Sequence, residues 1–72
     1  MKVYMLTEEI IGDASSFSVR GIWKDKDTAM AYAKLGASCT GQAADLQRLG
    51  NRVTAYVTKD YAFTVYEMTL LD

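Results

Sequence analysis

The side chains in this 72-residue chain that could carry chemistry are few, and their spacing does not favour catalysis. Glu8 and Glu9 are neighbours, so on a strand they point to opposite faces and cannot share one proton or one metal ion. Asp13, Asp25 and Asp27 could hold a cation, but the glycine and the distal glutamate of a calcium loop are missing. Turn formation and helix capping account for these three aspartates more simply.

Nucleophiles and bases are equally scarce, because the chain has no histidine and a single cysteine, Cys39. Histidine is the usual general base near neutral pH and the commonest metal ligand, so its absence excludes serine-histidine and cysteine-histidine mechanisms. We interpret Cys39 as an incidental thiol in a connector. Gly36 and Gly41 frame a small-residue loop without any phosphate-binding motif. The sequence therefore predicts a protein that is not an enzyme, with no catalytic residue, no cofactor and no metal site.

Composition indicates a folded, intracellular domain, since half of the residues are apolar and about a quarter are charged. A lone cysteine cannot form an internal disulfide, the N-terminal segment lacks a signal-peptide pattern, and no run approaches the roughly 20 apolar residues that span a bilayer. Eight basic and nine acidic residues leave a net charge of −1, which disfavours general binding to nucleic acid. We expect one cytoplasmic domain, residues 1–72, short enough to benefit from self-association and without a membrane segment.

Two strand-like runs flank the turn-forming cluster at residues 12–16, which predicts a β-hairpin over residues 2–24. If those five residues form the loop, the register places Glu8 opposite Arg20 as an ion pair.

Helical signals follow the hairpin. Asp25 can cap a helix through its side chain, and residues 28–35 are rich in helix formers, with Ala29, Met30 and Ala33 forming one apolar stripe at helical spacing. We predict that Gly36 ends this helix and that residues 40–49 form a second one. One continuous helix over residues 26–49 is the alternative. At roughly 100° per residue, however, its first apolar stripe, which contains Ala33, and its second, which contains Leu46, would lie about 220° apart and could not face one sheet.

A second hairpin is predicted between residues 53 and 71, with its turn within residues 59–62. An even loop would mix the apolar and polar sets of its two strands, whereas an odd loop segregates them and is preferred. The odd loop places on one face Val53, Ala55, Val57, Phe63 and Val65. We expect the helical segment to cover this set together with the apolar set of the first hairpin, which is Val3, Met5, Ile11, Phe17, Val19 and Trp23. The expected fold is α+β: a four-stranded antiparallel sheet in the order β-β-α-α-β-β, with one face covered by one or two short helices.

So little helix leaves the other sheet face uncovered, and tyrosine and methionine on such a face are typical of protein interfaces. The alternative is that these are ordinary half-exposed strand residues, since tyrosine is favoured in strands. We predict that this face binds a protein partner or a second copy. The predicted partner-binding residues are Tyr4, Leu6, Ile22, Tyr56, Tyr66 and Met68.

The first half of the chain resembles a group of small uncharacterised phage and bacterial domains with a β-hairpin, helix, β-hairpin order. The resemblance rests on the strands at residues 2–6 and 19–23 and on the helix at residues 25–35 with Ala29 and Ala33 inside it. Residues 37–52 depart from that pattern. The resemblance implies a phage or prophage origin, and small proteins from that source often act by occupying a surface of a host protein, including defence complexes.

The predicted function is therefore a non-enzymatic protein-binding module of the inhibitor or adaptor type, acting on a host protein or on itself as a homodimer. A nucleic-acid or nucleotide-binding accessory protein is the alternative, and it requires clustered positive potential on the folded surface. A small-molecule sensor with a pocket between helix and sheet is a third possibility.

Overall fold

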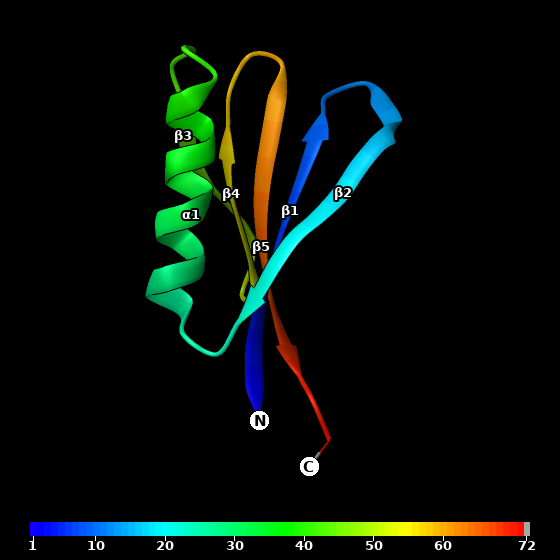
Figure 1. Ribbon diagram of the computed structural model, residues 1–72, viewed down its shortest axis with the longest axis vertical. Helices are drawn as coiled ribbons and strands as arrows, with labels where there is room; N and C mark the ends of the chain where they lie inside the picture. Colours follow the sequence, from blue (N-terminus) through cyan, green and yellow to red (C-terminus); the bar gives the residue numbers. More distant parts are fainter. Residues whose placement is uncertain (72) are drawn as a thin grey trace.

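The computed structural model, which describes residues 1–71, has one helix packed on one face of a five-stranded antiparallel sheet (Figure 1). The strands lie in the order β2-β1-β5-β4-β3. The helix α1 therefore connects β2 and β3, which are the strands at the two opposite edges of the sheet. Strands β1 and β5 are central neighbours, which brings Lys2 opposite Thr69. The elements are β1 Lys2–Ile10, β2 Asp13–Trp23, α1 Lys26–Cys39, β3 Asp45–Gly50, β4 Val53–Val57 and β5 Tyr61–Thr69.

The chain is α+β, but the prediction of four strands and two helices in the order β-β-α-α-β-β is wrong. The segment expected to form a second helix, residues 40–49, instead contains most of β3, which pairs with β4 from Asp45 to Gly50. All six residues of β3 are exposed, so pairing of its backbone with β4, rather than burial of its side chains, holds it in place. Without β3, the N–H and C=O groups along that side of β4 would lack a partner.

Helix α1 begins where the sequence predicted and ends later. The Asp25 carboxylate accepts hydrogen bonds from Thr28 N at 3.1 Å and Thr28 Oγ1 at 2.6 Å, which confirms the predicted cap. The predicted stop at Gly36 is wrong, because the helix continues to Cys39 and the Thr40 hydroxyl then donates to Ala37 O at 2.6 Å. Glycine often follows the last turn of a helix, but Gly36 lies inside α1, against Phe63 of the sheet.

Alanines form the face of α1 that meets the sheet. Ala29, Ala33 and Ala37 recur every four residues and have at most 1% of their surface exposed. Residues at this spacing lie above one another on one side of a helix, and small side chains let the helix axis approach the strands closely. The core cluster consists of these alanines with Leu6, Phe63 and Val65.

The first hairpin turns earlier than predicted. Ile10 pairs with Asp13, so the turn consists of Ile11 and Gly12 rather than residues 12–16. Gly12 has φ +90°, a conformation that glycine adopts without steric cost.

The register of β1 with β2 also differs from the prediction. Leu6 pairs with Gly21 and Thr7 with Val19, which leaves Arg20 as the extra residue of an irregularity in the ladder. Glu8 lies opposite Ser18, so the predicted pairing of Glu8 with Arg20 is wrong.

The second hairpin has an even loop. Thr58 N donates to Tyr61 O at 2.8 Å, which leaves only Lys59 and Asp60 between the paired residues. Gln42 holds this turn from outside, because its Nε2 donates to Asp60 Oδ2 at 2.6 Å and its Oε1 accepts from Asp60 N at 3.2 Å. The preferred odd loop is therefore wrong, and every side chain of β4 lies on the opposite face from the one expected.

Candidate functional site

Strand pairing sorts the side chains of the sheet into two faces. Leu6, opposite Val65, belongs to the core beneath α1, and Tyr4, Trp23 and Tyr56 pack against that core. The alternate residues point to the other face, which α1 does not cover and which we call the open face. Rows of paired residues run across it. They are the apolar row Ile22, Met5, Tyr66 and Val53; the middle row Val19, Thr7, Thr64, Ala55 and Gln47; the acidic row Glu9, Ala62, Val57 and Asp45; and the end pair Val3 and Met68.

The structure divides the six predicted partner-binding residues between the two faces. Leu6 is buried in the core, while Tyr4 and Tyr56 are partly buried against it on the helix side. The prediction that all six share one uncovered face is therefore wrong. The three that the register brings together on the open face are Ile22, Tyr66 and Met68. Their role in binding a partner stays a prediction.

Sequence reasoning missed the other apolar residues of the open face. It placed beneath the helix Val3, Met5, Val19, Val53 and Val57, all of which the register puts on the open face. No local sequence signal assigns the β4 residues to a face, because the assignment depends on the parity of the turn. A two-residue turn at Lys59 and Asp60 pairs Val57 with Ala62, and this pairing reverses the faces assigned to β4.

The open face is mainly apolar and carries its charged residues at one end, although Val3 and Ala55 on this face are only 5% and 1% exposed. Ile22 and Val19 have 56% and 53% of their surface exposed, at the edge of the sheet formed by β2. In the middle row, Thr7 and Thr64 are short and buried among their larger neighbours. The four sets contain no lysine or arginine, and their only charged residues, Glu9 and Asp45, both lie in the acidic row.

The opposite side of the molecule has an open groove between α1 and β2. One wall is the stacked pair Trp23 and Tyr32, whose ring centroids are 5.0 Å apart at an interplanar angle of 13°. Glu8, Arg20 and the exposed Cys39 also line it. Among residues 1–71, no group of three or more histidine, cysteine, aspartate or glutamate residues is placed to hold a metal ion. The groove thus combines an aromatic packing surface with one exposed thiol.

The carboxylate with a clear shift in acidity is Asp25, at the start of α1. Hydrogen bonds from the Thr28 hydroxyl and the Thr28 backbone N–H lower the pKa of Asp25 below its ordinary value. This carboxylate is fully exposed and occupied in capping the helix. The shift therefore reflects a structural role.

The chain matches no model of a known protein family, no curated protein and no solved structure. In the part of the chain that the structure describes, no helix is both long enough and apolar enough to span a lipid bilayer.

Proposed function

We propose that this protein is a non-enzymatic protein-binding module that associates with a second copy of itself through the open face. One observation carries the proposal: each of the four sets on the side of the sheet away from α1 contains apolar residues. An antiparallel sheet with a solvated face usually alternates apolar residues inward with polar residues outward. Here Ile22, Met5 and Tyr66 take outward positions, where Ile22 is 56% exposed and Met5 and Tyr66 are half-buried.

The size of the open face supports a dimer. Strands about 4.8 Å apart, with a rise of about 3.4 Å per residue, give five strands and four rows a projected area on the order of 400 Å². That projected area is about half of the roughly 800 Å² that each partner buries in a standard interface, so the face fits a dimer of the smaller, weaker class. Two such sheets can pack face to face with their strands within about 30° of each other.

The acidic row determines how two copies would face each other. A two-fold axis along the strands would place Glu9 and Asp45 of one copy over the acidic row of the other. Like charges in direct opposition are unfavourable, so this arrangement is disfavoured. An axis along the apolar row instead separates the two acidic rows to opposite ends and stacks Met5 and Tyr66 on their copies. The charge pattern thus favours one self-complementary arrangement.

Light scattering coupled to size-exclusion chromatography tests the self-association. We expect a dimer for the wild-type protein and a folded monomer for an Ile22→Ser/Tyr66→Ser variant. Leu35→Ser is the matched control, because Leu35 on α1 is 58% exposed, close to the 56% of Ile22, but lies on the helix side. A wild-type protein that stays monomeric at millimolar concentration, or an Ile22→Ser/Tyr66→Ser variant that stays dimeric, would overturn the proposal.

Cross-linking tests the arrangement. In a Cys39→Ser background, Met5→Cys places a thiol in the apolar row, and Ala62→Cys places one in the acidic row. A short bismaleimide should join two Met5→Cys chains readily and two Ala62→Cys chains poorly. The reverse preference would place the acidic rows together and contradict the proposed axis.

The inhibitor or adaptor role implied by the resemblance to phage domains fits the same surface, and we place that role in the host cytoplasm. A module of this kind acts by occupying a protein surface, which requires no active site. A host protein would compete with the second copy for the open face. Its binding should therefore convert the homodimer into a complex containing one copy of this chain, which light scattering detects as a change in mass.

A further inference from the structure

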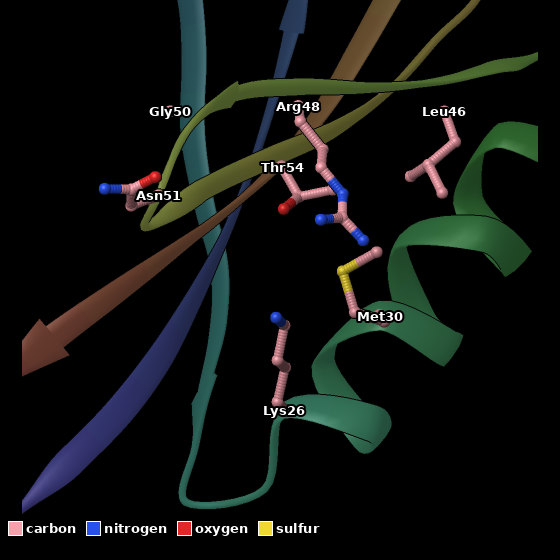
Figure 2. Close-up of a pocket in the computed structure, with 7 residues that line it drawn as sticks. All are labelled: Lys26, Met30, Leu46, Arg48, Gly50, Asn51 and Thr54. Atoms are coloured by element: carbon pink, nitrogen blue, oxygen red, sulfur yellow. The ribbon is translucent and has the colours of Figure 1, made fainter.

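A second surface feature lies at the other side of the sheet, apart from the open face. A cavity of about 460 Å³ opens between the first turns of α1 and the hairpin formed by β3 and β4 (Figure 2). Three elements meet there because β3 is present as an edge strand beyond β4. The residues that matter at this cavity are Lys26 and Met30 from α1, Leu46 and Arg48 from β3, Asn51 from the turn, and Thr54 from β4.

Two cationic side chains converge on this cavity. Arg48 reaches from β3 toward α1, and Lys26 reaches from the start of α1 toward β3 (Figure 2). Within residues 1–71 neither cation has a carboxylate at ion-pair distance, and no acidic residue lines the cavity. The acids nearest in sequence, Asp25 and Asp27, belong to the first turn of α1 but are not part of the lining. The cavity therefore concentrates uncompensated positive charge.

Two other basic residues, Lys2 and Arg52, lie near a carboxylate. The Nε of Arg52, in the turn between β3 and β4, lies 3.9 Å from Glu67 Oε2, and Lys2 Nζ lies 3.8 Å from the same oxygen. Glu67 thus lies at ion-pair distance from both of these basic residues. It also lines a smaller adjoining hollow with Lys26, but it is not part of the lining of this cavity and is not at ion-pair distance from Lys26 or Arg48. Both cations are exposed to solvent, and an anion placed between them would be attracted by both.

The rest of the lining indicates the class of anion. A guanidinium and an ammonium are the usual partners of phosphate oxygens, and the Thr54 hydroxyl lies beside Arg48 as a further donor (Figure 2). Met30 and Leu46 supply an apolar wall, and Leu46 is 54% exposed there. The volume lies within the range of about 300–1,000 Å³ typical of small-molecule sites. We propose that the cavity binds a small organic phosphate, with Lys26 and Arg48 holding the phosphoryl oxygens and Met30 and Leu46 contacting the organic group.

A nucleic-acid strand fits this surface less well than a single phosphate group. Binding a polynucleotide requires several cations along a track, because each contacted phosphate contributes to affinity separately. Here the adjacent basic residues, Lys2 and Arg52, are paired with Glu67, and the whole chain carries a net charge of −1.

Titration of the ¹⁵N-labelled protein with phenyl phosphate, followed through amide chemical shifts, tests the proposal. We expect saturable shifts centred on Lys26, Gly50 and Thr54, with weaker binding of inorganic phosphate because it lacks the group that contacts the apolar wall. Lys26→Ala and Arg48→Ala should each weaken phenyl phosphate binding by about tenfold or more, since each removes a charge-assisted hydrogen bond. Both residues are exposed, so their variants should keep the wild-type fold, which far-ultraviolet circular dichroism checks.

Lys34→Ala and Arg20→Ala are the matched controls, because both remove an exposed cation outside this cavity. They should leave the affinity for phenyl phosphate unchanged. The proposal fails if no saturable shift occurs at millimolar phenyl phosphate, if the control variants lose as much affinity as Lys26→Ala and Arg48→Ala, or if inorganic phosphate binds equally well. Tighter binding of a short single-stranded oligonucleotide than of phenyl phosphate would also overturn it, in favour of a nucleic-acid site.

Discussion

The backbone of α1 at Gly36 lies so close to the ring of Phe63 that a Cβ at Gly36 would come within 2.7 Å of Phe63 Cε1. Phe63 is 3% exposed and belongs to the core cluster, so its ring has little space into which to move. The glycine is therefore required by the contact between helix and sheet. This contact sets the distance of α1 from the central strand β5.

Replacing Gly36 by alanine should destabilise the protein. Alanine favours a helix by about 1 kcal/mol over glycine, but overpacking a core contact costs about 1–3 kcal/mol, so the clash with Phe63 should dominate. Urea unfolding of Gly36→Ala measures the difference. Ser38→Ala, at an exposed position of α1, is the control and should unfold near the wild-type midpoint. A more stable Gly36→Ala variant would show that the ring of Phe63 moves aside freely.

The alanine face of α1 should reject larger side chains. Ala33 is fully buried between α1 and the sheet, whereas Ala31, two residues earlier, is exposed. Ala33→Leu should lower the free energy of unfolding by about 1–3 kcal/mol because the helix must move away from the strands. Ala31→Leu adds the same atoms on the solvent side and should change stability by less than about 0.5 kcal/mol. Equal effects in thermal or urea unfolding would contradict the close approach of α1 to the sheet.

The stacked rings of Trp23 and Tyr32 should attach α1 to β2. Tyr32→Ala removes a ring whose centroid is 5.0 Å from that of Trp23, and aromatic pairs contribute about 0.5–1.5 kcal/mol beyond their buried area. We expect a lower unfolding midpoint and changed emission from Trp23, the only tryptophan. Tyr32→Phe keeps the ring and should behave as the wild type. Unchanged emission in Tyr32→Ala would indicate that the rings do not stack in solution.

The cap of α1 should make stability depend on pH. Hydrogen bonds from Thr28 lower the pKa of Asp25 in the folded state, so the fold favours the ionised carboxylate. This contribution is present above the ordinary aspartate pKa of about 3.9 and is lost as the pH falls through the lower pKa of the folded state. Asp25→Ala should therefore reduce the melting temperature at neutral pH.

Asp25→Ser separates the cap from its charge, because serine can also accept a hydrogen bond from the backbone N–H at the helix start. It should keep more of the neutral-pH stability than Asp25→Ala. The melting-temperature difference between the wild type and Asp25→Ser should shrink in acid. A difference that stays constant down to strongly acidic pH would show that Asp25 does not stabilise the helix through its ionised form.

Several local features of this protein could be predicted from the sequence. The cap at Asp25 and the buried positions of Ala29 and Ala33 follow from interactions within a few residues, so their signals are complete in the local sequence. Two hairpins flanking a helix also follow from local turn and strand signals. The presence of an uncovered sheet face follows from one short helix beside several strands.

The identity of that face could not be predicted locally, because the parity of a turn determines it. Thr58 bonds to Tyr61 across a two-residue loop, and this single shift reverses every side chain of β4 relative to β5. Tyr56 thereby lies beneath α1, and Val53 and Val57 lie on the open face. The sequence alone allows either loop length between β4 and β5, since an even and an odd loop satisfy the same strand preferences.

Taken alone, the sequence determined the α+β class, the start of the helix and the apolar stripe that contains Ala29 and Ala33, because each depends on near neighbours in the chain. The tertiary structure decided that Gly36 lies within the helix and that residues 45–50 form a strand. Gly36 continues the helix because Phe63 packs against it, and residues 45–50 form a strand because β4 needs a backbone partner at its edge. Both outcomes depend on groups far away in sequence, and local propensities of a fraction of a kilocalorie per residue cannot outweigh such contacts. The same strand completes the cavity between Lys26 and Arg48, so that site exists only once the chain has folded.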